Sequence, residues 1–188
     1  RCWPISCESN PKPLFRGFLG DRSLLEETVM RFTLAGCVLP KNVFVLTTGS
    51  GVPLAREQMG ALGIPPENII EEPKPEGTLG ALRYALGKIG KAGREILLLS
   101  MADNLIRPIE AFRAALLRAA LAAHTSKDGI VLSMGVPTRE QDTRYGHAVF
   151  HTSNTVIPGV YAVDRFVEKP KEPLKLAAGE QFTWDSGC

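Results

Sequence analysis

The feature that most constrains the fold is an apolar run that ends in a carboxylate, Ile96-Leu97-Leu98-Leu99-Ser100-Met101-Ala102-Asp103. An apolar run of this length, bounded by turn residues, predicts a strand buried on both faces, as in the middle of a parallel sheet. Ligands of open parallel sheets collect beyond the carboxyl ends of the strands, so Asp103 is well placed to hold a metal ion against phosphates. The alternative is that Asp103 only caps the following turn, which is a common role of aspartate.

Apolar runs alternate with helical patterns along most of the chain, which predicts a layered α/β domain with a largely parallel sheet. The other runs predict strands over residues 43–47, 68–71 and 130–135. Apolar residues at helical spacing, between capping and breaking residues, predict helices. These helices cover residues 23–35, 53–62, 78–89, 108–124 and 172–179.

The segment 145–168 changes this pattern, because short strands follow one another there without helices. Such a pattern predicts an antiparallel insertion, with turns at Ser153-Asn154 and Pro158-Gly159. No internal repeat or low-complexity linker interrupts the chain, so we expect one domain over residues 1–188.

Three helix starts carry local signals. Ser23 and Glu26 have the spacing of a capping box, which fixes the start of the first helix. Gly49-Ser50-Gly51 follows a predicted strand and could cradle a phosphate, although a plain strand-to-helix turn is the better interpretation of a lone glycine pair. Thr78 can cap its helix, and that helix start suits either ordinary capping or the acceptors of a nucleotide.

Composition excludes several classes of protein. Of the 188 residues, 44% are hydrophobic and 22% are charged, which is typical of a globular domain rather than a disordered one. A net charge of +2 gives no reason to expect nucleic acid or a membrane as the main partner. Four cysteines lack zinc-site or disulfide spacing and indicate reduced thiols in a cytoplasmic protein. No Walker A motif is present, which argues against a P-loop kinase or GTPase.

Several sparse motifs fall at predicted strand ends or in the adjoining loops. Cations, carboxylates and close-approach glycines at such places suit phosphate chemistry with a divalent metal. The motifs are Arg1-x-Trp3-Pro4, Pro11-Lys12, Glu72-Pro73 with Thr78, Ala102-Asp103, Pro137-Thr138, Tyr145-Gly146, Phe166-Val167-Glu168-Lys169-Pro170 and Trp184-x-Ser186-Gly187. In this order they resemble mannose-1-phosphate guanylyltransferases, also called GDP-mannose pyrophosphorylases, of the sugar-phosphate nucleotidyltransferase superfamily.

The resemblance implies a three-layer Rossmann-like nucleotidyltransferase fold, similar to GT-A, with a mostly parallel mixed sheet and an antiparallel insertion. It also implies that mannose 1-phosphate attacks the α-phosphorus of GTP, with Mg2+, to give GDP-mannose and pyrophosphate. An in-line displacement at phosphorus needs mainly positioning and charge neutralisation, which agrees with the residue types present. The implied roles are triphosphate and pyrophosphate binding for Arg1 and Lys12, guanine for Thr78, Mg2+ for Asp103, the sugar for Gly146 and Glu168, the sugar phosphate for Lys169, and the sugar hydroxyls for Asp185.

The chain departs from the family at several positions, among them Asp185, where Asn is usual. It starts at the Arg that follows the family's glycine-rich run, so we expect a portion cut at both ends, which alone need not turn over. The expected partners are GTP and mannose 1-phosphate, with a homodimer left open. The alternatives are a thymidylyl- or uridylyltransferase for glucose 1-phosphate, and a non-catalytic nucleotidyltransferase-like module or fragment.

Overall fold

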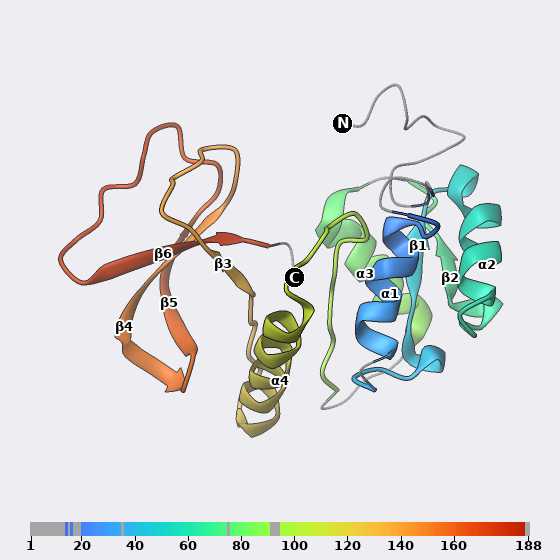
Figure 1. Ribbon diagram of the computed structural model, residues 1–188, viewed down its shortest axis with the longest axis horizontal. Coiled ribbons are helices and arrows are strands. Elements are labelled where there is room, and N and C mark those ends of the chain that lie inside the picture. The colour runs from blue at the N-terminus through green and yellow to red at the C-terminus, as the bar shows by residue number, and fades with distance from the viewer. Residues whose placement is uncertain are drawn as a thin grey trace. The chain divides into compact units, whose positions relative to one another are not determined.

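The computed structural model describes residues 14, 16, 20–34, 36–74, 76–90 and 95–186. These residues form two compact units (Figure 1). The first unit holds the described residues up to Glu95 together with Ala102–Leu105, and the second holds Ile96–Met101 and the described residues from Ile106 onward.

The first helix of the first unit, α1 (Leu24–Thr33), begins at the predicted capping box. The Glu26 backbone N–H donates to Ser23 Oγ at 3.1 Å, and the Ser23 N–H donates to Glu26 Oε2 at 2.7 Å. Arg16 Nη2 donates to Glu26 Oε1 at 2.6 Å, and this bond holds the pKa of that carboxyl below its usual value. The capping box is therefore confirmed, with an ion pair that keeps its carboxylate charged.

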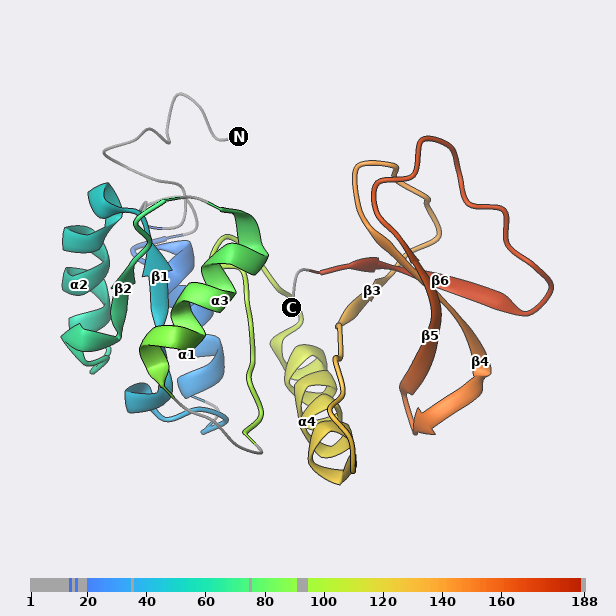
Figure 2. The ribbon, with the colours of Figure 1, turned by 180° about the vertical axis from the view of Figure 1, so that it is seen from behind.

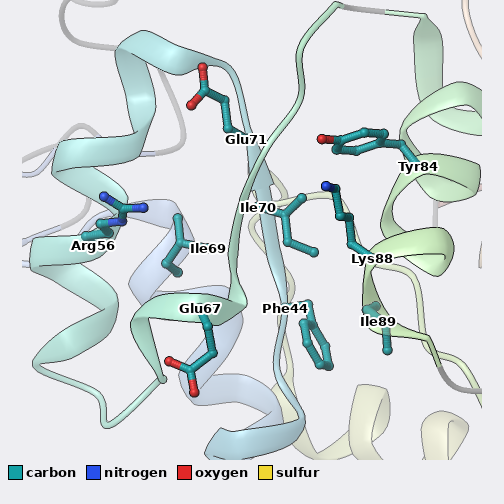
Figure 3. A pocket seen from close by; sticks show the side chains of 9 residues that line it. All are labelled: Phe44, Arg56, Glu67, Ile69, Ile70, Glu71, Tyr84, Lys88 and Ile89. Atoms are coloured by element: carbon teal, nitrogen blue, oxygen red, sulfur yellow. The ribbon is translucent and has the colours of Figure 1, made fainter.

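A parallel pair of strands forms the middle layer of the first unit. Strand β1 (Val45–Thr47) pairs with β2 (Ile69–Glu71), with Val45 opposite Ile69. These two side chains share a face of the pair and pack with residues of α1 and of α2 (Val52–Gly60) in one core cluster. Ile70 points to the other face, toward α3 (Gly77–Ile89), so two helices cover one face and a third covers the other (Figure 3).

Short 3-10 helices join these elements at Pro40–Asn42, Gly49–Gly51 and Pro66–Asn68. The Gly49–Gly51 turn packs against the protein itself: a Cβ on Gly51 would lie 2.3 Å from Thr47 Oγ1, and one on Gly49 would lie 2.8 Å from Glu71 Oε1. This favours the plain strand-to-helix turn, because both glycines are needed for close approach to neighbouring side chains.

The second unit combines one helix with an antiparallel sheet. The helix is α4 (Ile109–Thr125), and the strands are β3 (Gly135–Pro137), β4 (His147–Ile157), β5 (Val160–Val167) and β6 (Glu180–Asp185). Their spatial order is β3-β6-β4-β5, which can be followed in Figures 1 and 2. Strand β6, the last in the chain, thus lies between β3 and β4.

The strand predicted over residues 96–100 is not formed, which is the main correction to the sequence analysis. Ile96, Leu97 and Leu99 are 53%, 55% and 40% exposed, and no ladder partner runs beside them in the described part of the chain. The strand predicted over 130–135 is not formed either, because only Gly135 among its residues belongs to a strand, at the start of β3, and Val131 is 98% exposed. Apolar composition supplies a buried face, but a strand also needs a neighbour to pair its backbone groups.

The helix predicted over residues 172–179 is absent as well. The Gln141 side chain accepts from the Leu174 N–H and donates to the Leu174 carbonyl at 3.3 Å, so these backbone groups are paired outside any helix. The predicted turn at Ser153-Asn154 is wrong too, because β4 runs through it with register shifts against β5. The turn at Pro158-Gly159 is confirmed, and Gly159 there has φ +82°.

The α/β fold class is confirmed, with a parallel pair of strands and a separate antiparallel sheet. Among the residues that the structure describes, no helix is both long and apolar enough to cross a membrane.

Candidate functional site

Arg1 and Lys12 lie outside the described residues. The other predicted site residues fall into two groups, one in each unit. Thr78 and Asp103 belong to the first unit; Gly146, Glu168, Lys169 and Asp185 belong to the second.

Asp103 lies in a turn that is attached to the first unit. Ala102 packs against the core cluster, and Arg31 Nη2 donates to the Asn104 carbonyl at 2.9 Å. Arg31 is itself only 4% exposed, so a buried cation anchors the backbone on the far side of Asp103. The turn thus holds a partly buried carboxylate between two anchored neighbours, although the strand predicted to lead into it is not formed.

Thr78 lies in the first turn of α3 and is exposed. The N-cap of this helix is Glu76, whose side chain makes no capping hydrogen bond, so the prediction that Thr78 caps the helix is wrong. The N-cap lies two residues before Thr78, because Gly77, with φ +76°, makes the backbone bend at which the helix begins. Thr78 presents a hydroxyl at the helix start, where the dipole favours negative groups.

The four predicted residues of the second unit meet at one end of the antiparallel sheet. His147 pairs with Val167 on β5 and with Trp184 on β6, so the preceding residue, Gly146, lies between Glu168 and Asp185. The Asp185 N–H donates to the Gly146 carbonyl at 2.9 Å, which fixes the β6 side of this arrangement.

Gly146 leaves room that a larger residue would fill. A Cβ at this position would lie 2.5 Å from Phe166 Cζ and 2.8 Å from Glu168 Oε2. The glycine therefore lets the Glu168 carboxylate lie over the backbone between two strands, an arrangement that any side chain here would disturb.

Lys169 completes the cluster with a cation. Its Nζ lies 3.2 Å from Glu168 Oε1, and both side chains are more than half exposed. Its backbone has φ +41°, a left-handed conformation that is unfavourable for a residue with a Cβ. Two carboxylates and one ammonium thus share one end of the sheet, and such a set can accept hydrogen bonds from hydroxyls and bind a phosphate.

Two features of this site were missed by the sequence analysis. Ser133 Oγ donates to Asp185 Oδ1 at 2.7 Å, although no motif marks this serine. Phe166 lies against Gly146, although the motif that contains Phe166 assigned it no role in the site. The only signal for either is strand register, which the sequence does not encode locally.

Aromatic rings lie beside the cluster. Trp184 stacks on Tyr145 with ring centroids 5.0 Å apart, and its Nε1 donates to the Glu140 carbonyl at 3.0 Å. These contacts give Trp184 a packing role in the second unit. Arg144 lies over Tyr145 and hydrogen-bonds to Asp142, and this bond lowers the pKa of Asp142 to about 2.

The first unit also has a hollow of about 350 Å3 beside β2 (Figure 3). Tyr84 and Lys88 reach it from α3, and Arg56 reaches it from α2 on the other side of the strand. Of the predicted site residues that the structure describes, none lines it. Within the described part of the chain, no three His, Cys, Asp or Glu side chains gather as a metal site.

Comparisons with known proteins found relatives that match the whole chain. XanB, a xanthan biosynthesis protein of Xanthomonas campestris pv. campestris, is 35% identical over 191 residues, which cover 100% of this chain and 38% of that protein. AlgA, an alginate biosynthesis protein of Pseudomonas aeruginosa, is 30% identical over 190 residues, with the same two coverages. A mannose-1-phosphate guanylyltransferase of Escherichia coli is 31% identical over 194 residues, covering 100% of this chain and 39% of that protein.

The chain therefore spans less than two fifths of the length of these curated relatives. The sequence model described as nucleotidyl transferase matches residues 1–188, the whole chain. The chain belongs to the nucleotidyl transferase family.

Proposed function

We propose that the chain is part of an enzyme that transfers GMP from GTP to mannose 1-phosphate. A phosphate oxygen of mannose 1-phosphate attacks the α-phosphorus of GTP, the bond to the β-phosphate breaks, and GDP-mannose and pyrophosphate result. Family membership and relatives named mannose-1-phosphate guanylyltransferase support this choice of substrates. The observation that carries it is the cluster of Gly146, Glu168, Lys169 and Asp185.

The second unit supplies groups suited to a sugar phosphate. Glu168 and Asp185 are acceptors for sugar hydroxyls, and Lys169 is a donor and counter-charge for the phosphate. A positioned acceptor substrate is what an in-line displacement most requires, because the attacking oxygen must approach opposite the leaving group. We assign Gly146 the role of letting Glu168 lie close over the backbone, where its carboxylate can meet the sugar.

The first unit supplies groups suited to the nucleotide. We assign Thr78 to the neighbourhood of the guanine, and Arg1 and Lys12 to the triphosphate and the leaving pyrophosphate. Asp103 is the candidate ligand for Mg2+. Magnesium in such sites is usually held by one or two carboxylates together with substrate phosphates, and a single anchored Asp fits that mode. When bound, the ion neutralises charge on the phosphates.

Two other functions remain as alternatives: thymidylyl or uridylyl transfer to glucose 1-phosphate, and a non-catalytic nucleotidyltransferase-like module. Asp185, in place of the usual Asn, gives a reason to test the choice of sugar. Family membership and scattered cysteines leave the cytoplasm as the expected compartment, and this stays a prediction.

A pyrophosphate-release assay with magnesium tests the proposal on a version of the chain extended through the family's glycine-rich run, because the chain alone need not turn over. We expect release from GTP with mannose 1-phosphate to exceed release from dTTP or UTP with glucose 1-phosphate. Asp103→Asn should lower the rate at least about a hundredfold, the scale of losing one group that stabilises developing charge. The matched control is Asp128→Asn, an exposed aspartate in the turn after α4, which should keep the full rate. Full activity of Asp103→Asn would refute the metal role, and no release with any triphosphate would favour the non-catalytic module.

A further inference from the structure

Ser133 lies two residues before β3, the strand that borders β6. Gly135 of β3 pairs with Asp185 of β6, and this register brings the segment before β3 alongside the end of β6. There Ser133 Oγ donates to Asp185 Oδ1 at 2.7 Å. The serine is exposed, and among the described residues its hydroxyl makes this one hydrogen bond.

The hydrogen bond from Ser133 fixes the side-chain rotamer of Asp185, which the backbone of Asp185 leaves free. Its N–H is already tied to the Gly146 carbonyl at 2.9 Å, which sets the backbone but not the side-chain rotamer. The Ser133 hydroxyl holds one carboxylate oxygen, and the second oxygen keeps its acceptor sites. A side chain held in one rotamer before a ligand arrives loses less conformational entropy when it binds.

The pairing also matches the identity of residue 185. An ionised carboxylate only accepts hydrogen bonds, whereas the amide of the Asn usual in the family both donates and accepts. A hydroxyl next to a carboxylate has one clear orientation, because its proton points at the acceptor. Ser133 therefore donates to one oxygen of Asp185, and the other oxygen can accept a hydrogen bond from a sugar hydroxyl.

We propose that Ser133 is a positioning residue for the sugar end of the site and acts through Asp185 on the affinity for a hexose 1-phosphate. The inference rests on the proposed function, because it takes Asp185 to contact the sugar hydroxyls. Ser133 does not touch the nucleotide in this account, so its effect is confined to one of the two substrates.

Calorimetric titration of the full chain with mannose 1-phosphate, and separately with GTP and magnesium, tests this. Ser133→Ala should weaken the binding of mannose 1-phosphate about three- to tenfold, which is the range expected for the loss of one hydrogen bond. GTP affinity and the thermal midpoint should stay unchanged. Ser133→Thr keeps the hydroxyl and should restore the sugar affinity. Ser126→Ala, at a partly exposed serine whose hydroxyl donates to the Asp128 carbonyl, is the control and should bind like the wild type.

A double-mutant cycle separates positioning from a direct contact. In an Asp185→Ala background, Ser133→Ala should cause no further loss of affinity, because the serine then has no carboxylate to hold. Equal mannose 1-phosphate affinity of wild type and Ser133→Ala would overturn the inference and leave the proposed function intact. Equal losses for mannose 1-phosphate and GTP would also overturn it, as a general structural effect. No binding of mannose 1-phosphate by the wild type would overturn the proposed function, and the inference with it.

Discussion

Replacing Lys169 separates the stability of the second unit from its proposed binding function. Among the described residues Lys169 is the only non-glycine residue with positive φ, at +41°. A side chain in this region costs about 1–2 kcal/mol, and glycine removes that cost. Glycine also gives the unfolded chain more freedom, which offsets about 0.5–1 kcal/mol. Lys169→Gly should thus be more stable than Lys169→Ala by about 0.5–1 kcal/mol.

The lost ion pair does not disturb this comparison. Lys169 and Glu168 are 66% and 62% exposed, and exposed pairs contribute little to stability. Both variants lose the pair and the positive charge, so both should lose affinity for mannose 1-phosphate to the same extent. For a chain of this length the difference in stability corresponds to about 1–4 °C in the thermal midpoint.

Thermal unfolding and calorimetric titration of the two variants give the test. The expected result is a higher midpoint for Lys169→Gly than for Lys169→Ala, together with equally weakened sugar-phosphate binding. Equal midpoints would contradict the backbone strain. Wild-type affinity in either variant would contradict the role of the ammonium group.

Two further predictions concern the same sheet. Gly146→Ala should displace the ring of Phe166, which is 50% exposed, and lower the thermal midpoint by no more than about 4 °C. It should also displace Glu168 and weaken the binding of mannose 1-phosphate about tenfold. Unchanged affinity would argue against a sugar site here. The hydrogen bond from Arg165 lowers the pKa of Glu180 to about 2, so the stability it contributes is present above the usual carboxyl pKa of 4.5 and is lost as pH falls toward 2. The midpoint of the wild type should therefore fall more steeply than that of Glu180→Gln over this range, and parallel curves would refute the assignment.

Local signals in the sequence predicted the helices of the first unit well. The capping box at Ser23 needs only two residues three apart, and the structure forms both of its hydrogen bonds. The turn of the β4–β5 hairpin was also predicted correctly, because Pro158-Gly159 specifies it locally. These elements depend on residues that are close in sequence, so their pattern is complete within a short window.

Elements that depend on distant partners were predicted less well. The run Ile96–Leu99 has the composition of a buried strand, yet strand formation depends on a neighbour whose position no local pattern specifies. The helix expected over 172–179 failed for a related reason, since Gln141, far away in sequence, takes the backbone groups of Leu174.

The candidate site shows the same division. Motif resemblance selected Gly146, Glu168 and Asp185, and strand register brings them side by side in the second unit. Ser133 could not be selected in this way, because its only distinction is a hydrogen bond to Asp185 across two strands. Residue type predicts the chemistry of a site, whereas the residues that orient it emerge only from the fold.

Nucleotide selectivity tests the central claim most directly. The chain would be titrated with GTP, dTTP and UTP in the presence of magnesium, with mannose 1-phosphate present and absent. Our account predicts that GTP binds most tightly and that Asp103→Asn weakens this binding. Tighter binding of dTTP or UTP, or no binding of any of the three, would contradict guanylyl transfer by this chain.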